Sequence, residues 1–552
     1  MKFVSLASLA GLIVSLIAFS PSLQPARGQV SVTLGQNFTS STFGTDTSGT
    51  PADSNGAIGS QHFAEFINGS FAVYNKTNGQ SLKRISDLKF WSNAGLNLSA
   101  TDGVADPRIV FDPASQRWFA SMVDFDANAT DPTLEANDFL LAVSATADPR
   151  GTWKGFLFEA DPDTGAFADF PTLGVDSNGV YLSAEMYHGE SNPLGSGLVS
   201  IPKADLLAAT PTIANRTWFG VMDYSLRGQV LQPVNCWDGS SSGKLIATSD
   251  YGNDSDPHSN IVSFAVLNAG GTPATLTAST FIPTAPWVVP DSPYLPAPAF
   301  HPIQPDGSDT LVGNEARFSG RVSCVNGLIH AVHCTEVNGR VAIRWYRIRA
   351  SDNSLLESGT ISDPDLDFFY PSIAANSNGV VMICFNASGL STYISCYAVA
   401  GQTANNTTTF GSRVLLQAST VSYHDFYEQL GLNDTSRWGD YSATTVDPTN
   451  PNHFWTIQMF ALPDPTFDTV WATQITELIT APAVVNLALT KTGTNVTLAW
   501  PTQFADYQLQ SATNLAVPIF WSDVSQTRAT NGGQLSVVLP ASAQRQFFRL
   551  KK

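Results

Sequence analysis

Acidic, basic and aromatic residues stand at or just before the first strand of a two-strand unit at several separated points of this chain. They share that position in a recurring unit, and they are Asp53, Asp106, Arg108, Asp169, Arg317, Tyr370, Arg437, Trp438, Asp440 and Tyr441. Carboxyl groups transfer protons, guanidinium groups bind carboxylates through paired hydrogen bonds, and aromatic rings offer apolar faces to a ligand. Residues so far apart can act together only if the fold brings their positions to one place.

The recurring unit is a short strand, a turn with Asp or Asn and usually Gly, and a second strand that is strongly apolar. Copies include ADSNGAIGSQHFAEFI from Ala52, DFPTLGVDSNGVYLSAEM from Asp169 and YPSIAANSNGVVMICF from Tyr370. Seven such copies occur along the chain, at spacings of roughly 50 to 90 residues. Short apolar runs separated by turn residues indicate many strands and few helices.

This pattern predicts an all-β fold that is mostly a β-propeller. VVMICF is apolar at consecutive positions, so both faces of its strand need cover, and a ring of blades supplies that cover. Seven blades are favoured, with six or eight as alternatives, and a β-helix is the main rival architecture. The segment SVTLGQNFTSST is expected to close the ring against the last blade. Because propeller sites form around the central channel, the residues before each first strand are the candidate site.

The chain divides into three predicted regions. Residues 1–28 have a positive start, an apolar run and a small-residue cleavage pattern, which together indicate a secretory signal peptide. Residues 29–480 would form the propeller. Residues 484–552 would form a small immunoglobulin- or fibronectin-like β-sandwich, whose predicted core is Leu489, Val496, Leu498, Trp500, Leu509, Trp521 and Phe548. The mature protein is therefore expected to be secreted or on the cell surface, with no membrane span.

The chain is acidic. It has 28 Lys and Arg against 46 Asp and Glu, a net charge of −18, and removal of Lys2 and Arg27 with the signal peptide makes this −20. Such a surface repels phosphate backbones and anionic lipids. Nucleic acid and membrane surfaces are thus disfavoured as partners.

Five cysteines allow at most two disulfides in an oxidising compartment. Cys384 and Cys396 flank a predicted hairpin turn and are the preferred pair. Cys236 and Cys324 hold corresponding places in successive repeats and could also meet.

One acidic loop has the spacing of a calcium site. The segment DFDANATDPTLE places oxygen-bearing side chains at positions 1, 3, 5, 7 and 12 of an EF-type loop, namely Asp124, Asp126, Asn128, Thr130 and Glu135. Position 6 is Ala129 where such loops need glycine, so a solvated acidic loop is the alternative. Calcium is the one cofactor that the sequence suggests.

The quoted repeats, together with DPRIVFDPASQRWFAS, ARFSGRVSCVNGLIHAVH and RWGDYSATTVDP, resemble a family of uncharacterised secreted bacterial proteins with sialidase-like (BNR-type) propellers. The last 70 residues, ending FFRLKK, resemble a C-terminal module of secreted Verrucomicrobia-like proteins. The full aspartate box of sialidases, S-x-D-x-G-x-T-W, has no copy here.

The resemblance implies candidate catalytic roles. By analogy with sialidases, Tyr370 with Glu315 would be the nucleophile pair, and Asp53 or Asp106 would be the acid. Arg108, Arg317 and Arg437 would bind one ligand carboxylate. The structural alternative is that these charges pair with one another and join the blades.

The sequence therefore predicts a secreted or surface β-propeller that binds an extracellular ligand, a carbohydrate or a protein. The alternative is a carbohydrate-active enzyme, a sialidase-like glycoside hydrolase with its site at the channel mouth. The sequence leans toward binding, and it does not determine the oligomeric state.

Overall fold

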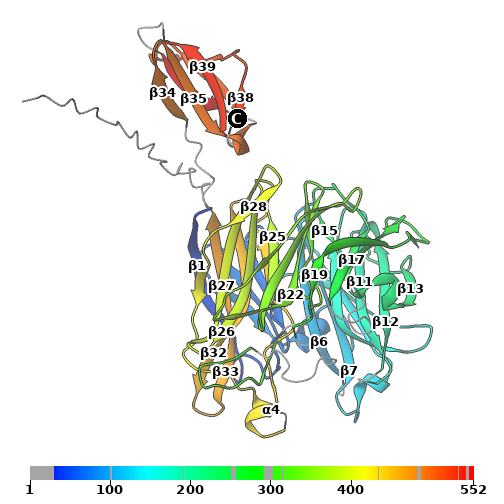
Figure 1. Ribbon diagram of the computed structural model, residues 1–552. Coiled ribbons are helices and arrows are strands. Elements are labelled where there is room, and N and C mark those ends of the chain that lie inside the picture. The colour runs from blue at the N-terminus through cyan, green and yellow to red at the C-terminus, as the bar shows by residue number, and fades with distance from the viewer. Residues whose placement is uncertain are drawn as a thin grey trace, which may run out of the picture.

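Strands dominate the protein. The computed structural model describes residues 30–551 except 100–101, 190–191, 250–256, 291–301, 314–315, 433, 481–486, 506, 532–533 and 542–545. Within these residues, seven sheets of four or five strands follow one another along the chain (Figure 1). They are the blades of an all-β propeller, numbered 1 to 7 here in chain order. The predicted fold class is confirmed.

Blades 1 to 3 are each built from four consecutive antiparallel strands. Blade 1 contains β2 (Asn55–Ile58), β3 (His62–Ile67), β4 (Ser70–Asn75) and β5 (Ser81–Ile85). Blade 2 contains β6 (Asp102–Asp112), β7 (Arg117–Asp126), β8 (Asp138–Ser144) and β9 (Trp153–Glu159). Blade 3 contains β10 (Phe167–Val175), β11 (Gly179–Tyr187), β12 (Pro193–Pro202) and β13 (Thr217–Met222).

Blades 4 and 5 are linked through a short strand. Blade 4 contains β14 (Gln229–Pro233), β16 (Lys244–Thr248), β17 (His258–Leu267), β18 (Thr275–Leu276) and β19 (Thr280–Trp287). Blade 5 contains β21 (Ser323–Val325), β22 (Leu328–Val337), β23 (Arg340–Arg349) and β24 (Leu355–Ile361). The link is β15 (Asn235–Cys236), which continues from β14 and pairs in parallel with β21.

Blades 6 and 7 complete the ring. Blade 6 contains β25 (Asp367–Ala375), β26 (Val380–Gly389), β27 (Thr392–Ala404), β28 (Thr407–Phe410) and β29 (Val414–Gln417). Blade 7 contains β31 (Ala443–Val446), β32 (His453–Asp464), β33 (Asp468–Thr480) and β1 (Val32–Thr42). A two-stranded ribbon of β20 (Leu311–Val312) and β30 (Ser436–Arg437) joins the segments that precede blades 5 and 7.

The first strand of the chain closes the ring. β1 runs antiparallel to β33 as the outermost strand of blade 7, with Val32 opposite Thr480 and Phe38 opposite Ile475. The innermost strands also meet, because β31 of the last blade contacts β2 of the first. The prediction that SVTLGQNFTSST closes the propeller is thus confirmed.

The core lies between blades, which explains the two-sided apolar strands. On β26, Val381, Ile383 and Phe385 pack toward blade 5 in one buried cluster. Their neighbours Met382 and Cys384 point the other way, into a cluster with blade 7. Successive strand residues face opposite sides, so a strand buried on both sides must be apolar throughout.

The repeated turn after each innermost strand has a common cause. Four turn residues, Asp112, Asp176, Asn376 and Asp447, each accept a hydrogen bond from the backbone N–H two residues on, at 2.7 to 3.1 Å. A short side chain with a carboxylate or amide oxygen thus stabilises the tight turn. This is the physical basis of the repeat that the sequence showed.

Helices are few and short. They are α1 (Asp87–Asn93), α2 (Lys203–Leu206), α3 (Tyr224–Arg227), α4 (Phe426–Gln429) and the 3-10 turns η1 (Pro132–Leu134) and η2 (Thr502–Phe504). α2 lies in the segment KADLLAA, whose apolar residues recur at helical spacing. α1 was missed although Ser86 caps it, its side chain accepting from the N–H of Lys89. In the described part of the chain, no helix has the length and apolar character of a membrane span.

The C-terminal strands form two further sheets, which lie apart from the blades in Figure 1. One contains β34 (Ala488–Thr492), β35 (Asn495–Pro501), β38 (Ala529–Asn531) and β39 (Gln534–Pro540), and the other contains β36 (Gln508–Ala512), β37 (Ser522–Asp523) and β40 (Phe547–Lys551). Leu498, Trp500 and Leu509 are buried as expected. Leu489 is 57% exposed, so its place in the predicted core was wrong. The signal peptide and the boundary at 481–486 lie outside the described residues.

All five cysteines are free and buried, which corrects the predicted Cys384–Cys396 disulfide. On adjacent strands, Cys384 stands opposite Ala398 and Cys396 opposite Asn386, so the two thiols are diagonal neighbours. The other pair is better placed, since Cys236 and Cys324 lie directly opposite each other on β15 and β21.

Candidate functional site

Several innermost strands have a residue in the left-handed backbone region, either just before the strand or in its first half. Asp53, Asp106, Phe170, Val230 and Tyr370 have φ between 49° and 64°, although none is glycine. Register shifts mark β-bulges at these places in blades 2, 3, 4 and 6. Such strained residues collect at sites where the chain must redirect a side chain. The bulges define one mouth of the central channel.

Polar side chains just after these bulges join neighbouring blades. Arg108 donates from Nε to the Pro171 carbonyl at 2.7 Å, and Thr172 donates to the Leu231 carbonyl at 2.7 Å. Gln232 donates to Phe318 in the same way, at 2.5 Å. The bulges therefore turn polar groups toward the next blade, where they satisfy exposed carbonyls.

Five acids and three arginines gather at this mouth, which we call the acidic mouth. Its charged members are Asp53, Asp106, Asp169, Glu185, Asp440, Arg108, Arg317 and Arg437. The fold thus brings together ten residues predicted from sequence and adds Glu185. The sequence could have pointed to Glu185, because it is the one charged residue in the strand VYLSAEM.

The buried acids hold blades 1, 2 and 7 together. Asp53 accepts from the N–H of Asp440 at 2.8 Å and from Asn68 Nδ2 at 2.7 Å. Asp106 accepts from the Tyr441 hydroxyl at 2.7 Å. Burial, with repulsion from Asp440 and Asp106, raises the pKa of Asp53 well above its ordinary value, and burial with repulsion from Asp440 raises the pKa of Asp106.

The three arginines do not bind one common carboxylate. Arg317 pairs with Glu185 at 3.1 Å, and Arg437 pairs with Asp440 at 2.8 Å. Arg108 bonds to carbonyl groups, and its guanidinium carbon lies 3.4 Å from the centre of the Tyr441 ring. Each cation thus has a partner inside the protein, as the structural alternative stated above expects.

The aromatic residues predicted to stack on a sugar are buried. Tyr370 and Tyr441 are each 2% exposed, and Trp438 is 1% exposed, packed on Tyr423 and bonded through its indole N–H to Asn386. These rings fill the core instead of facing solvent, so none of them offers a face to a ligand.

Tyr370 is poorly placed to act as a nucleophile. Its hydroxyl donates to the Val312 carbonyl at 3.1 Å, and burial, then repulsion from Asp440, raises its pKa well above the ordinary tyrosine value. Its proposed partner Glu315 lies outside the described residues. At this mouth, the tyrosines that do contact an acid are Tyr441, which donates to Asp106 at 2.7 Å, and Tyr187, which donates to Glu185 at 3.1 Å.

Asp169 is the accessible acid of the mouth. Its side chain is exposed, and its one hydrogen bond in the described structure comes from the N–H of Phe170 at 2.8 Å. Desolvation of the carboxyl group by the surrounding protein, followed by repulsion from Asp106, raises its pKa to about 7. Arg437 is also accessible, with 53% of its side chain exposed. The mouth thus presents one acid and one cation to a ligand.

The predicted calcium loop is not assembled. Asp124 accepts from the N–H of Asp138 at 2.7 Å, and Asp126 accepts from that of Asn128 at 2.9 Å. Thr130 and Glu135 lie in the loop beyond β7 without joining them. Over the described ranges, no three His, Cys, Asp or Glu side chains are placed to hold a metal ion. Because strands flank the loop and Ala129 replaces glycine, its carboxylates stabilise turns instead.

Asp169 should make stability depend on pH. Its pKa is raised in the folded state, so the stability it contributes is lost as pH rises toward 7 and beyond. Buried His330 and His333 have pKa values lowered to about 4 and about 3, which favours folding as pH rises to 6.5. The two trends oppose each other below pH 6.5. Above it, deprotonation of Asp169 lowers the free energy of unfolding together with other groups whose pKa is raised, such as Asp53 and His424.

We therefore expect the melting temperature to fall between pH 6.5 and 8, and Asp169→Asn to reduce that fall. Because the carboxyl is exposed, the effect should be ~1 kcal/mol. Thermal unfolding at both pH values measures it. Asp352→Asn is the control, since the pKa of Asp352 is lowered to about 2 and its charge is constant in this range. An equal fall in wild type and Asp169→Asn would contradict the assignment.

No family model and no curated protein matches the chain. Solved structures similar to it include the α-L-arabinofuranosidase Arb93A of Fusarium graminearum, at 10% identity over 80% of this chain and 98% of that one, with a TM-score of 0.37. Trypanosoma rangeli sialidase matches at 8% identity over 94% and 89%, with a TM-score of 0.33. Drosophila Semaphorin 1b matches at 7% over 81% and 87%, with a TM-score of 0.34. At such values these neighbours carry no information on activity, and no family is identified.

Proposed function

We propose that this protein is a secreted β-propeller that binds a neutral carbohydrate at the acidic mouth. The observation that carries the proposal is that Asp169 and Arg437 are accessible there, although Arg437 also pairs with Asp440, while the other charges of the mouth are engaged inside the protein. Sugar hydroxyls both donate and accept hydrogen bonds, so a carboxylate and a guanidinium together suit them. A protein ligand is the alternative partner.

Binding is favoured over hydrolysis by the state of the other groups. A retaining or inverting glycosidase needs a second carboxylate, or an activated tyrosine, within reach of the sugar. Asp53 and Asp106 are buried and hydrogen-bonded. Tyr370 and Tyr441 are also buried, and the raised pKa of each hydroxyl keeps it protonated. These arrangements suit a rigid recognition surface.

Loss of sugar binding should follow removal of either accessible group. On a glycan array, Asp169→Asn and Arg437→Met should each weaken the wild-type signal about tenfold or more, as expected for a charge-assisted hydrogen bond. Arg349 and Asp352 supply the control variants. They form an exposed ion pair at 2.9 Å, three residues apart as Arg437 and Asp440 are, but away from the mouth. Arg349→Met and Asp352→Asn should bind like wild type. Equal binding by all four variants would disprove the site.

Hydrolysis is the second candidate, and one observation favours it. A carboxyl with a pKa of about 7, as in Asp169, can act as a general acid near neutral pH. Chromogenic glycosides test this directly. Turnover by wild type that disappears in Asp169→Asn would replace binding with catalysis as the function, and absence of turnover with intact binding would support the first proposal.

A further inference from the structure

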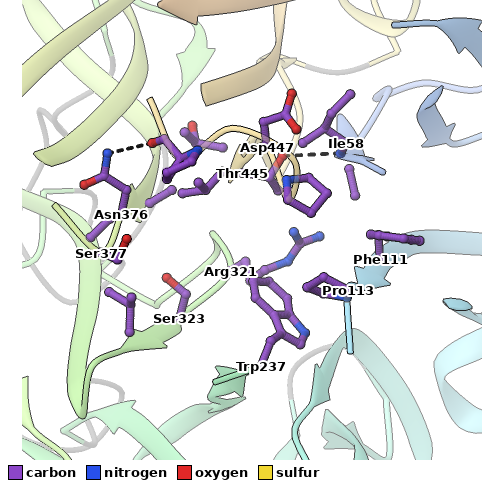
Figure 2. Close-up of a pocket in the computed structure, with 18 of the residues that line it drawn as sticks. Ile58, Phe111, Pro113, Trp237, Arg321, Ser323, Asn376, Ser377, Thr445 and Asp447 are labelled. Atoms are coloured by element: carbon purple, nitrogen blue, oxygen red, sulfur yellow. Dashed lines mark hydrogen bonds between the residues drawn. The ribbon is translucent and has the colours of Figure 1, made fainter. Parts of the chain in front are cut away.

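A pocket of about 340 Å³ opens at the opposite mouth of the channel, where the innermost strands end. Residues from the ends of β2, β6, β21, β25 and β31 line it, so five blades contribute. Its walls are largely apolar, as with Ile58, Phe111 and Pro113 (Figure 2). This pocket contains none of the charged residues of the acidic mouth.

One arginine stands in the pocket. Figure 2 shows the guanidinium of Arg321 at the centre of the lining residues. It donates from one nitrogen to the Ile109 carbonyl. Among the described residues no carboxylate forms an ion pair with it. We call this cavity the arginine pocket.

The electrostatic surroundings of Arg321 do not offset its desolvation. Burial, with repulsion from Arg108 farther along the channel, lowers the pKa of Arg321 to about 9. Cations withdrawn from water are normally paired, so the half-buried Arg321, which has no carboxylate partner among the described residues, indicates a missing anion.

The two acids at the rim do not fill this role. Asp447 accepts from Lys76 Nζ at 2.7 Å, which neutralises it. Asp238 accepts from the N–H groups of Asn326 and Ser240, at 2.6 and 2.9 Å, and holds a turn. Arg321 therefore remains the group of the pocket available to a ligand's charge.

The pocket also offers a place for an apolar ring. Trp237 lines it, and the indole nitrogen of Trp237 is buried without a hydrogen-bond partner in the described structure. Aromatic and proline side chains bind flat apolar groups, and an indole N–H can donate to an oxygen. A bare inorganic ion would leave these walls uncovered.

We propose that the arginine pocket binds an organic anion, with its carboxylate, sulfate or phosphate group on Arg321 and an apolar body against Trp237 and the neighbouring walls. The site is separate from the acidic mouth and does not depend on the function proposed there.

Two fluorescent probes of nearly the same shape test this. Anilinonaphthalene sulfonate carries an anionic group on an aromatic body, and phenylnaphthylamine is the same body without it. Native wild-type protein should bind the sulfonate saturably and at least tenfold more tightly than the neutral probe. Inorganic sulfate should compete with the sulfonate and leave the neutral probe bound. Equal affinities, or no saturable binding, would overturn the proposal without any variant.

Variants then locate the site. Arg321→Met should weaken the sulfonate at least tenfold and change the neutral probe less than twofold, whereas Arg349→Met, at an exposed arginine, should change neither. Trp237→Ala removes an apolar wall without touching the Ile109 contact, and it should weaken both probes, so it serves if Arg321→Met does not fold. Unchanged sulfonate binding in Arg321→Met would show that the probe binds elsewhere and would refute the assignment. If Arg321→Met does not fold, unchanged sulfonate binding in Trp237→Ala would refute it in the same way.

Discussion

Replacing Glu65 with leucine should lower the free energy of unfolding by roughly 3 to 5 kcal/mol. Glu65 lies on β3 of blade 1 and is fully buried. Its carboxylate accepts from Ser40 at 2.6 Å and from Ser41 at 2.7 Å, both on the closing strand β1. It also accepts from Thr473 on β33 at 2.6 Å and from Tyr74 at 3.1 Å.

This one side chain therefore joins the first blade to both outer strands of the last. Leucine has a similar volume but no acceptor, so it would leave buried hydroxyl groups without their charged partner. The cost should concentrate at the closure, because the other blade interfaces keep their contacts. Faster hydrogen exchange in β1 than in β26 would show this local opening.

Thermal and urea unfolding measure the loss, and Glu135→Leu is the control. Glu135 is exposed in a loop, so its replacement should change stability by less than about 0.5 kcal/mol. A Glu65→Leu protein as stable as that control would mean that the closure does not depend on this carboxylate.

The second large effect is expected at Lys203. This lysine is 5% exposed, and its Nζ lies 2.6 Å from Asp112 of blade 2 and donates to the Asp176 carbonyl of blade 3 at 2.7 Å. Lys203→Met keeps the apolar stem but leaves the Asp112 carboxylate buried without a countercharge. We expect a loss of roughly 3 to 5 kcal/mol at pH 7.

A double variant separates the charge effect from the packing effect. Lys203→Met with Asp112→Asn has no buried charge left, so it should recover more than half of the loss in urea unfolding. Lys89→Met, at an exposed lysine of α1, should be neutral. A single variant within 1 kcal/mol of wild type, or a double variant no better than the single, would show that the pair is not a stabilising contact.

The channel has opposite chemistry at its two mouths. Carboxylates outnumber arginines where the innermost strands begin, five against three, whereas Arg321 is the cation of the far pocket. The two probes of function are therefore independent. Sugar binding tests Asp169 and Arg437, and anion binding tests Arg321, so failure of one leaves the other standing.

Much of the architecture could be read from local pattern. A turn acid such as Asp176 or Asp447 stabilises its own hairpin through the N–H two residues on, and that contact needs no distant residue. The alternation on β26 likewise reports two buried faces. These signals predicted the blades, and the polar residues before each strand predicted where the mouth lies.

Local pattern misled where distant partners decide the outcome. The short span between Cys384 and Cys396 favoured a disulfide, but the register of β26 with β27 sets the thiols diagonally. The sequence indicated Trp438 and Tyr441 as ligand-binding aromatic residues, but blades that are distant in the sequence bury both side chains. Leu489 followed a strand pattern and still faces solvent.

The sequence by itself determined a closed ring of β-blades and the set of polar residues at its mouth, because turn chemistry and strand alternation act over a few residues. Only the tertiary structure decided that Asp169 is accessible while Asp53 and Asp106 are buried, that Arg317 meets Glu185, and that Arg321 has no carboxylate partner within the described part of the chain. Burial and ion pairing depend on side chains from other blades, and the distances between side chains of different blades are set only when the ring closes.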